Sequence, residues 1–335
     1  AEDGIRDRSP SRGLGDVYKR QIALVFSTSS FANSIGVIYD SGGKFDKSFN
    51  ELAFRTAERV QNELGWDMLE FEAANNTQIE QGMRKVADRG ATLIVAMGFA
   101  QADAVAAIAP QYPDINFVAV DVCWVDDPAG NIYQACYLEH EGSFLVGMIA
   151  AMASKSGTIG FVGGMDIPLI RKFQGGYEQG ALHVNPNIKI LANMTGTTPE
   201  AWNNPTKGAE LTKAQIDGGA DVVYQAAGGT GIGVLQAAAD AGIYGIGVDT
   251  NQNWMHPGSM LTSMLKRLDL TIFAQAEKTA AGTFEPGIHF LGLADGMVGY
   301  AIEDGQVTAE MQSAVEAAAA EIVSGAITVA DWSQE

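Results

Sequence analysis

DSGGKFDKSFN, residues Asp40–Asn50, joins two segments whose apolar residues follow different periods. Before it, the apolar run Ile35–Tyr39 (IGVIY) is typical of a buried strand. After it, Glu51–Leu64 has the apolar spacing of an amphipathic helix. The sequence therefore predicts a strand-to-helix turn. Gly42 and Gly43 support this interpretation because glycine adopts backbone angles that other residues avoid.

The turn also carries more varied chemistry than a connection needs. Ser48, followed three positions later by Glu51, has the spacing of a capping box, which predicts that a helix begins there. The first N–H groups of a helix have no partner within the helix, so we expect the side chains around them to face a binding site. These side chains are two acids, a cation, an aromatic ring and an amide: Asp40, Asp46, Lys47, Phe49 and Asn50. A capped turn without a ligand is the alternative.

The length and composition of the chain predict a two-domain α/β protein. Its 335 residues exceed what a single hydrophobic core usually supports. A hydrophobic content of 47% with 39 glycines is typical of a globular protein. No apolar run approaches the roughly 18 residues of a membrane span, so we expect a soluble mature protein. The formal net charge of −19 would repel phosphates and anionic lipids, which argues against binding DNA or RNA.

Residues 1–32 do not follow the pattern of the rest of the chain. Residues 1–21 lack hydrophobic periodicity, and Asp16–Gln21 (DVYKRQ) resembles a translated sequencing-adapter end. Ile22–Phe26 and the residues after it resemble the tail of a secretory signal peptide, with Ser30–Ala32 as a cleavage site. We therefore expect this segment to be a non-native tail plus a truncated signal peptide remnant, and the mature protein to be periplasmic.

The cysteines and histidines give no metal site. Cys123 and Cys136 flank a short loop, so they could pair in an oxidising compartment or remain two buried thiols. The four histidines are scattered, and we expect them at the surface or in the core. The motifs G-x-S-x-G and H-E-x-x-H and a Cys/His pair are lacking, so no catalytic residue and no cofactor is predicted. Paired carboxylates could perform glycoside chemistry, but a sequence does not fix their separation.

Strands and helices are predicted to alternate from Ile35 onward, which indicates parallel sheets with helices on both faces. A second set of elements begins at Thr158 and repeats the architecture, so we expect two doubly wound lobes. The elements after Asp249 exceed what the second lobe needs, which predicts that the chain crosses back and returns through a multi-crossing hinge. The expected ranges are 33–155 and 266–290 for the N-terminal lobe, and 156–265 and 291–335 for the C-terminal lobe.

Polar or glycine residues follow most of the predicted strands. In open α/β sheets, ligands bind beyond the carboxyl ends of the strands, where helix N-termini converge. A single acid there is more often a helix cap, but several together predict a shared pocket for hydroxyl or amine donors. The run Gly228–Gly233 is not a nucleotide fingerprint, because Val234 occupies the sixth position of G-x-G-x-x-G. The residues that follow strands are Asp40, Gly98, Asp121, Asp166, Gly228 and Asp249.

Five segments in collinear order carry a resemblance to a known family. They are DSGGKFDKSFNE (Asp40–Glu51), HEGSFLVGMIAA (His140–Ala151), QAAGGTGIGV (Gln225–Val234), IGVDTNQ (Ile246–Gln252) and LTSMLKR (Leu261–Arg267). Together they resemble the basic membrane protein (BMP, PnrA-like) family over about residues 33–300. Its members are extracytoplasmic purine-nucleoside-binding proteins of ABC transporters with the type I periplasmic-binding-protein fold. The resemblance implies that fold and that ligand class here.

The resemblance also implies a set of ligand-binding residues. Phe49 would stack on one face of the purine, and Trp202, where relatives have Phe, would stack on the other. Polar groups would line the base end, from Asp40, Ser48 and Asn50. Another set would hold the ribose, from Gly228, Asp249 and Lys266. Three further residues would complete the wall: Met97, Gly98 and Asp121.

Physical chemistry agrees with these implied roles. Stacking of a base on an aromatic side chain contributes roughly 1–3 kcal/mol, and each charge-assisted hydrogen bond to a ribose hydroxyl about 1.5–3 kcal/mol. Acids in the pocket would disfavour a 5′-phosphate, which favours nucleosides over nucleotides.

We therefore expect a binding protein without catalytic turnover, a monomer that closes by hinge motion and delivers a purine nucleoside to an ABC permease driven by a separate ATPase. Three alternatives remain. The ligand could be a pentose or another hydroxylated small molecule, since Trp202 would also stack on a sugar. The chain could be a nucleoside hydrolase that uses the carboxylates of the cleft. A transcriptional regulator of the same fold would need a DNA-binding helical module before Ile35, which is not visible.

Overall fold

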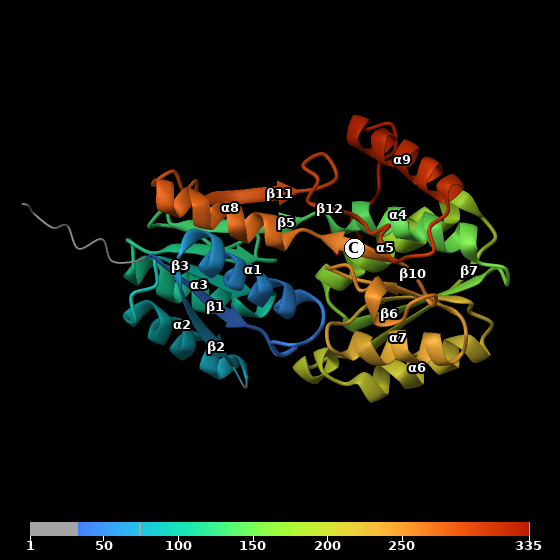
Figure 1. Cartoon of the computed structure of the whole chain (residues 1–335), viewed down its shortest axis with the longest axis horizontal. Helices are drawn as coiled ribbons and strands as arrows, with labels where there is room; N and C mark the ends of the chain where they lie inside the picture. The colour runs from blue at the N-terminus through green and yellow to red at the C-terminus, as the bar shows by residue number, and fades with distance from the viewer. Residues whose placement is uncertain (1–32, 74, 335) are drawn as a thin grey trace, which may run out of the picture. The chain divides into compact units, whose positions relative to one another are not determined.

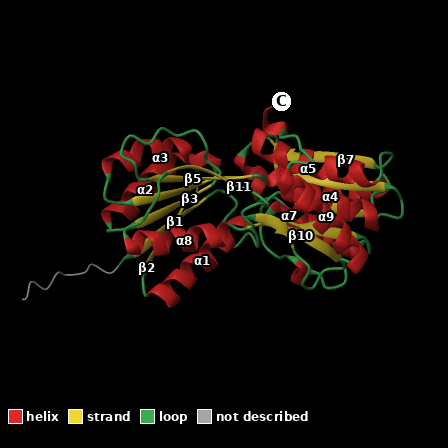
Figure 2. Ribbon diagram, turned by 90° about the horizontal axis from the view of Figure 1, so that it is seen from above, coloured by secondary structure: helices red, strands yellow, loops and turns green. Residues whose placement is uncertain are grey.

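The computed structural model describes residues 33–73 and 75–334. These residues form two six-stranded sheets with helices packed around them (Figure 1, Figure 2). This arrangement confirms the predicted α/β fold class with two lobes. The expectations for residues 1–32 lie outside the described residues.

The first sheet has the strand order β11-β5-β4-β3-β1-β2, with parallel pairing throughout. Its strands are β1 (Ser34–Tyr39), β2 (Asp67–Glu72), β3 (Leu93–Met97), β4 (Asn116–Val120), β5 (Ile132–Tyr137) and β11 (Gly287–Leu291). The helices packed against it are α1 (Phe49–Leu64), α2 (Ile79–Asp88), α3 (Ala102–Ile108) and α8 (Leu268–Ala281). Because helices cover this parallel sheet, β1, β3 and β5 are mostly apolar and are buried at every residue.

The second sheet has the order β12-β10-β9-β8-β6-β7, parallel except for the β10–β12 pair. Its strands are β6 (Thr158–Met165), β7 (Lys189–Gly196), β8 (Val222–Ala226), β9 (Tyr244–Gly247), β10 (Met260–Lys266) and β12 (Val298–Tyr300). The helices of this lobe are α4 (Glu139–Ala153), α5 (Pro168–Val184), α6 (Pro205–Asp217), α7 (Thr230–Asp240) and α9 (Ala309–Ser324). The order β5-β4-β3-β1-β2 recurs as β10-β9-β8-β6-β7, so the two lobes share one topology.

Short 3₁₀ helices complete the chain and lie mostly beside longer elements. They are η1 (Asn76–Gln78), η2 (Phe99–Gln101), η3 (Ala109–Gln111), η4 (Pro199–Trp202), η5 (Asn253–Met255) and η6 (Trp332–Gln334). Two of them, η2 and η4, bring aromatic residues to the ends of the strands.

Within the described part of the chain, the path moves between the sheets three times: from β5 to α4, from β10 to α8 and from β11 to β12. Helix α8 packs on α1 and β4 of the first lobe, and β11 joins the first sheet. The ranges given above for the lobes stay a prediction. Helix α4 falls within residues 33–155, yet it packs on α5, β10 and β12, which favours a first crossing at Leu138.

Helix α1 begins differently from the prediction. The side chain of Ser48 makes no capping bond, so the predicted capping box is wrong. The Asp46 carboxylate instead accepts backbone N–H groups at 2.8, 3.0 and 3.1 Å, from Ser48, Asn50 and Glu51. The carboxylate of Glu51 pairs with Lys47 at 3.1 Å. Asp46 therefore satisfies the free N–H groups of the helix, which leaves the hydroxyl of Ser48 available elsewhere.

Candidate ligand-binding site

A cavity lies where the carboxyl ends of strands from both sheets meet, the position expected for ligands in open α/β sheets. Its empty volume is about 530 Å³, a figure that counts the space opening to solvent. Eight of the eleven predicted ligand residues line it: Asp40, Phe49, Gly98, Asp121, Trp202, Gly228, Asp249 and Lys266. The turn after β1 and the ends of β3, β4, β9 and β10 supply most of them.

The other three predicted residues do not line this cavity. Ser48 is buried, and its hydroxyl donates across the lobes to the Asp249 carboxylate at 2.7 Å. Asn50 is also buried, and its amide donates to Asp40 at 2.6 Å. The side chain of Met97 lies in the core at the end of β3. Ser48 and Asn50 thus hold two of the acids that do line the cavity.

Several lining residues are not in the predicted set: Gly42, Asp46, Phe99, Leu169, Ile170, Phe173, Ala226, Ala227 and Val248. Asp46 and Gly42 belong to the turn after β1, and their position in this segment could have predicted that they line the cavity. Phe173 lies in the second turn of α5, and its ring reaches the cavity because α5 begins beyond the end of β6. Only the fold brings that helix to the site.

The acids of the first turn form one hydrogen-bonded group. Asp40 accepts the backbone N–H of Gly42 at 2.8 Å in addition to the amide of Asn50. Burial raises the pKa of Asp40, although these two donors act against the rise. Burial likewise raises the pKa of Asp46 to about 7, against the effect of the three backbone N–H groups at the start of α1. The turn therefore presents partly desolvated carboxyl groups to the cavity.

Two acids occupy equivalent places in the two lobes. Asp121 follows β4 and Asp249 lies just after β9, and both adopt left-handed backbone angles, with φ of 62° and 65°. Non-glycine residues rarely adopt this conformation, and it recurs at ligand sites, where the surrounding structure holds it. The glycines near the ends of β3 and β8, Gly98 and Gly228, also have positive φ values of 92° and 55°. The four tight turns aim both carboxylates and both glycine backbones into one cavity.

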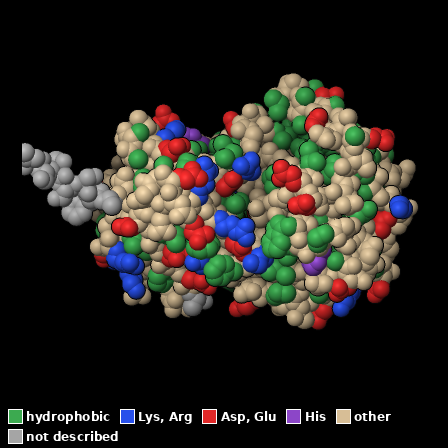
Figure 3. All heavy atoms as spheres, in the orientation of Figure 1, with side chains coloured by type: hydrophobic (Ala, Val, Ile, Leu, Met, Phe, Trp, Pro, Cys, Tyr) green, Lys and Arg blue, Asp and Glu red, His purple; other side chains and the backbone are tan. Residues whose placement is uncertain are grey.

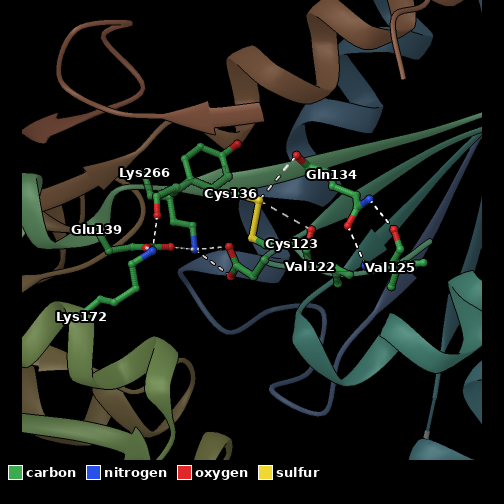
Figure 4. The surroundings of a disulfide bond; sticks show 10 residues. Val122, Cys123, Val125, Gln134, Cys136, Glu139, Lys172 and Lys266 are labelled. Atoms are coloured by element: carbon green, nitrogen blue, oxygen red, sulfur yellow. Dashed lines mark hydrogen bonds and ion pairs between the residues drawn. A yellow bond between two sulfur atoms is a disulfide. The ribbon is translucent and has the colours of Figure 1, made fainter. Parts of the chain in front are cut away.

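Lys266 is the cation among the residues that line the cavity, and acids surround it (Figure 4). Its Nζ lies 2.6 and 2.7 Å from the two carboxylate oxygens of Asp121 and 3.0 Å from Glu139 Oε1. Burial acts to lower the pKa of Lys266, but Asp121, Glu139 and Asp249 outweigh burial and raise it. Burial raises the pKa of Asp121 to about 6, although Lys266 acts in the opposite direction. Lys266 is therefore a buried ammonium ion, held mainly by protein carboxylates.

A disulfide lies beside this ion pair (Figure 4). It joins Cys123, two residues after Asp121, to Cys136 on β5, which decides between the two alternatives left open by the sequence. The backbone N–H of Asp121 also donates to Ala135 O at 3.0 Å. The segment that carries Asp121 is therefore fixed to β5 on both sides of the acid.

Aromatic rings from both lobes reach the cavity. Phe49, at the start of α1, belongs to the first lobe, and Trp202, at the end of η4, belongs to the second. Lys266 Nζ lies 5.2 Å from the centroid of Phe49 and 5.6 Å from that of Phe173. A Cβ at Gly164 would overlap the indole of Trp202, so glycine is required there for the indole to keep its place. Phe49 from one lobe and Trp202 from the other thus form parts of the cavity wall.

The lobes touch each other beside this cavity. Ser48 Oγ lies 3.1 Å from Val248 O as well as 2.7 Å from Asp249 Oδ2, and Gln252 donates to Lys47 O at 2.9 Å. Each of these bonds joins the turn after β1 to the segment around the end of β9. The structure is therefore in a closed arrangement, and the bonds must break if the lobes separate.

The described residues contain no group of three or more His, Cys, Asp and Glu side chains that could hold a metal ion. None of the helices in the described range is long and apolar enough to cross a membrane. On the face drawn in Figure 3, acidic side chains are spread among basic ones.

Comparisons with known proteins agree with this geometry. A family model described as "ABC transporter substrate-binding protein PnrA-like" matches residues 32–333. The chain therefore belongs to the Bmp family. Membership of the Bmp family implies a small-molecule ligand and an ABC transporter as partner. It also confirms the resemblance inferred from the five segments.

Individual relatives of this Bmp-family chain match over most of their length. The "ABC transporter nucleoside-binding protein BmpA" of Lactococcus lactis subsp. cremoris is 31% identical over 316 residues, covering 88% of each chain. "Basic membrane protein A1" of Borrelia garinii subsp. bavariensis is 31% identical over 311 residues, covering 90% of each. A solved solute-binding protein of an ABC transporter system from Aeropyrum pernix K1 is 26% identical, with a TM-score of 0.80 over 89% of this chain and 93% of that one.

Proposed function

We propose that this Bmp-family protein captures a purine nucleoside in the cavity between its lobes and delivers it to an ABC importer. The observation that carries the proposal is the meeting of Phe49, Trp202, Asp249 and Lys266 in one cavity, to which both lobes contribute. The name of the Lactococcus relative, a nucleoside-binding protein, supports the same ligand class.

The aromatic residues are proposed to hold the base. A purine is flat, and stacking on Phe49 and Trp202 would contribute roughly 1–3 kcal/mol for each ring. Asp40 borders the same cavity, and Asn50 fixes its carboxylate so that it can accept hydrogen bonds from the edge of the base. Gly98 lies beside Asp40 and leaves room for a ring to approach, since a Cβ there would meet Asp40 Oδ2 at 3.3 Å.

The ribose is proposed to lie against Asp249, Lys266 and the backbone of Gly228. A carboxylate accepts hydrogen bonds from two neighbouring hydroxyl groups, and an ammonium ion donates to them. The positive φ of Gly228 lets the backbone come close to the sugar. Asp121 completes the wall through its ion pair with Lys266.

The charges of the cavity favour a nucleoside over a nucleotide. Its described lining includes four carboxyl groups, on Asp40, Asp46, Asp121 and Asp249. The positive charge of Lys266 is already balanced by Asp121 and Glu139. A phosphate would therefore enter against several negative charges without a free cation to pair with.

The proposal also includes how the protein opens, where it works and which partners it has. The closed arrangement must open at the three crossings to admit a ligand, as hinged binding proteins do. We propose a monomer that works outside the cytoplasmic membrane, in the periplasm, without catalytic turnover and without a cofactor. Its partners are the ligand and the permease subunits. One of its relatives, in Pyrococcus furiosus, is named a lipoprotein, which agrees with a place outside the cytoplasm.

Mass spectrometry of the ligand released by denaturing freshly purified protein tests the proposal directly. We expect a purine nucleoside, and titration calorimetry should then rank adenosine, guanosine and inosine above ribose. A protein that prefers ribose would instead be a pentose-binding protein. Incubation with inosine, followed by chromatography, should yield no free base, and release of base would indicate a hydrolase.

A further inference from the structure

We infer that Glu139 and Lys172 are positioning residues for the proposed site: together they fix where the ammonium ion of Lys266 meets the ligand. The inference rests on the proposed nucleoside function and adds two residues to it. Neither residue lines the nucleoside cavity, and both line a neighbouring cavity that shares Asp121 with it.

Glu139 holds Lys266 from the side opposite Asp121. It is the first residue of α4, its side chain is fully buried, and its Oε1 lies 3.0 Å from Lys266 Nζ. Its Oε2 lies 2.8 Å from Lys172 Nζ (Figure 4). One carboxylate thus bridges two ammonium ions.

Lys172 is itself held in place. It projects from the first turns of α5, and its ammonium ion donates to Tyr137 O at 2.6 Å in addition to pairing with Glu139. Tyr137 ends β5, so Lys172 of the second lobe is joined to the last residue of a first-sheet strand. The chain of contacts runs from Asp121 through Lys266 and Glu139 to Lys172.

A lysine needs such support because its ammonium ion sits on a flexible four-carbon stem. With Asp121 alone, the ammonium ion could swing around that carboxylate and would meet a ligand hydroxyl in many positions. The second carboxylate, Glu139, fixes it from the far side, so less ordering is required when the ligand binds.

Lys172 makes this arrangement possible by balancing charge. A buried carboxylate is costly unless it is paired, and Glu139 would otherwise compete with Asp121 for the single cation Lys266. Lys172 supplies a second cation, so Lys266 can stay between the two acids. Burial opposes ionisation of Glu139, but Lys172 and Lys266 outweigh it and lower its pKa to about 2, which agrees with this role.

The network of Glu139, Lys172 and Lys266 lies beside the crossings between the two sheets. Glu139 follows the first crossing between the sheets, and Lys266 precedes the second. The ammonium ion is therefore placed by residues whose relative position is set at the hinge. In the closed arrangement of the lobes, these residues hold the ammonium ion of Lys266 at the cavity.

The test compares four proteins: wild type, Glu139→Gln, the double variant Glu139→Gln/Lys172→Met and the control Glu285→Gln. Glu285 forms an exposed pair with Lys278 at 2.9 Å, so the control removes a similar salt bridge away from the site. Two quantities are measured: the dissociation constant for adenosine and inosine, and the rate at which acetic anhydride labels Lys266 without ligand, read by peptide mass spectrometry.

We expect Glu139→Gln to weaken nucleoside binding at least tenfold and to speed labelling of Lys266 at least tenfold, with the control within twofold of wild type on both. The double variant removes the unpaired cation, so it should recover the stability of the fold while binding stays weak. If the single variant fails to fold, the double variant is compared with wild type and the control in its place. Binding and labelling within twofold of wild type in the double variant would overturn the inference. If the wild type binds no nucleoside, the proposed function fails, and labelling alone still decides whether Glu139 positions Lys266.

Discussion

The ends of β4 and β9 show how one fold makes two different acids. Both strands are equivalent in their sheets, and each is followed closely by an aspartate in the left-handed conformation, Asp121 in one lobe and Asp249 in the other. Asp121 grips Lys266 with both carboxylate oxygens. Among the described residues, the hydrogen bond to the carboxylate of Asp249 comes from the hydroxyl of Ser48.

This difference in partners means that the charge of Asp121 is used within the protein, whereas that of Asp249 is available to a ligand. Asp121 forms half of a buried ion pair, so removing its charge should disturb the network around Lys266. Asp249 has one neutral donor and faces the cavity, so most of its capacity to accept hydrogen bonds is left for a ligand. Under the proposed function, the same backbone position would thus serve stability in one lobe and ligand binding in the other.

The largest effect should come from Lys266, the cation that Asp121 shares with Glu139. Lys266→Met leaves the carboxylates of Asp121 and Glu139 buried without it, and we expect a loss of about 3–5 kcal/mol in the free energy of unfolding. Lys278→Met is the matched control, because it removes an exposed pair and should cost no more than about 1 kcal/mol. Urea unfolding of both variants measures the difference. Equal losses would show that the buried network adds nothing to stability.

Exchanging each of the two aspartates for asparagine should change a different quantity: nucleoside affinity for Asp249 and the free energy of unfolding for Asp121. Asp249→Asn is expected to weaken nucleoside binding tenfold or more, equivalent to about 1.5–3 kcal/mol for a charge-assisted hydrogen bond, with a smaller change in stability. Asp121→Asn should lower the free energy of unfolding by roughly 2–3 kcal/mol, since Lys266 loses one of its two partners. Calorimetry and urea unfolding on both variants give the two quantities. The same pattern of losses in both would mean that the two acids have the same role.

A smaller effect should appear in the pH dependence of stability. The pKa of Asp46 is raised to about 7 and that of Asp121 to about 6, so the folded chain binds protons where the unfolded chain has lost them. The free energy of unfolding should therefore decrease as the pH rises from about 4 to 7. Glu139, with its lowered pKa, acts with the opposite sign, and only between about pH 2 and 4.5.

Thermal or urea unfolding at several pH values checks this slope. Asp46→Asn should flatten the curve near pH 7, and Asp121→Asn should flatten it near pH 6. The repulsion of a chain with a net charge of −19 also grows with pH, so the difference between each variant and wild type isolates the single acid. A wild-type curve that rises from pH 5 to 7 would contradict the raised pKa values.

Much of the fold follows from local patterns in the sequence. Parallel strands buried on both faces are mostly apolar runs, so β1, β3, β4 and β5 are evident. Strand β2 (DMLEFE) was not predicted, because it lies at the edge of the sheet, carries three acids and buries only Leu69. An edge strand needs no second apolar face, and its pattern is correspondingly weak.

The site was predictable only where its residues lie in short segments. Asp40 and Asp249 lie at or just after the ends of strands and Phe49 begins a helix, and all three line the cavity as the strand-end rule suggests. No local pattern indicates that Ser48 reaches across to Asp249 instead of capping α1. Lys172 and Phe173 depend on how α5 packs beside the crossings, which no local pattern encodes.

The smallest effect should come from Trp202→Phe, a change of one aromatic ring for another that extends the comparison of the lobes from acids to rings. Trp202→Phe keeps a flat ring in the second lobe, so we expect less than a threefold change in nucleoside affinity, whereas Phe49→Ala removes the ring of the first lobe and should cost roughly 1–3 kcal/mol. Gly164→Ala leaves Trp202 itself unchanged, but its methyl group would overlap the indole and displace it. If Trp202 supports the ligand by stacking, Gly164→Ala should weaken binding more than Trp202→Phe does. The reverse order, measured by calorimetry, would mean that the indole only fills the wall.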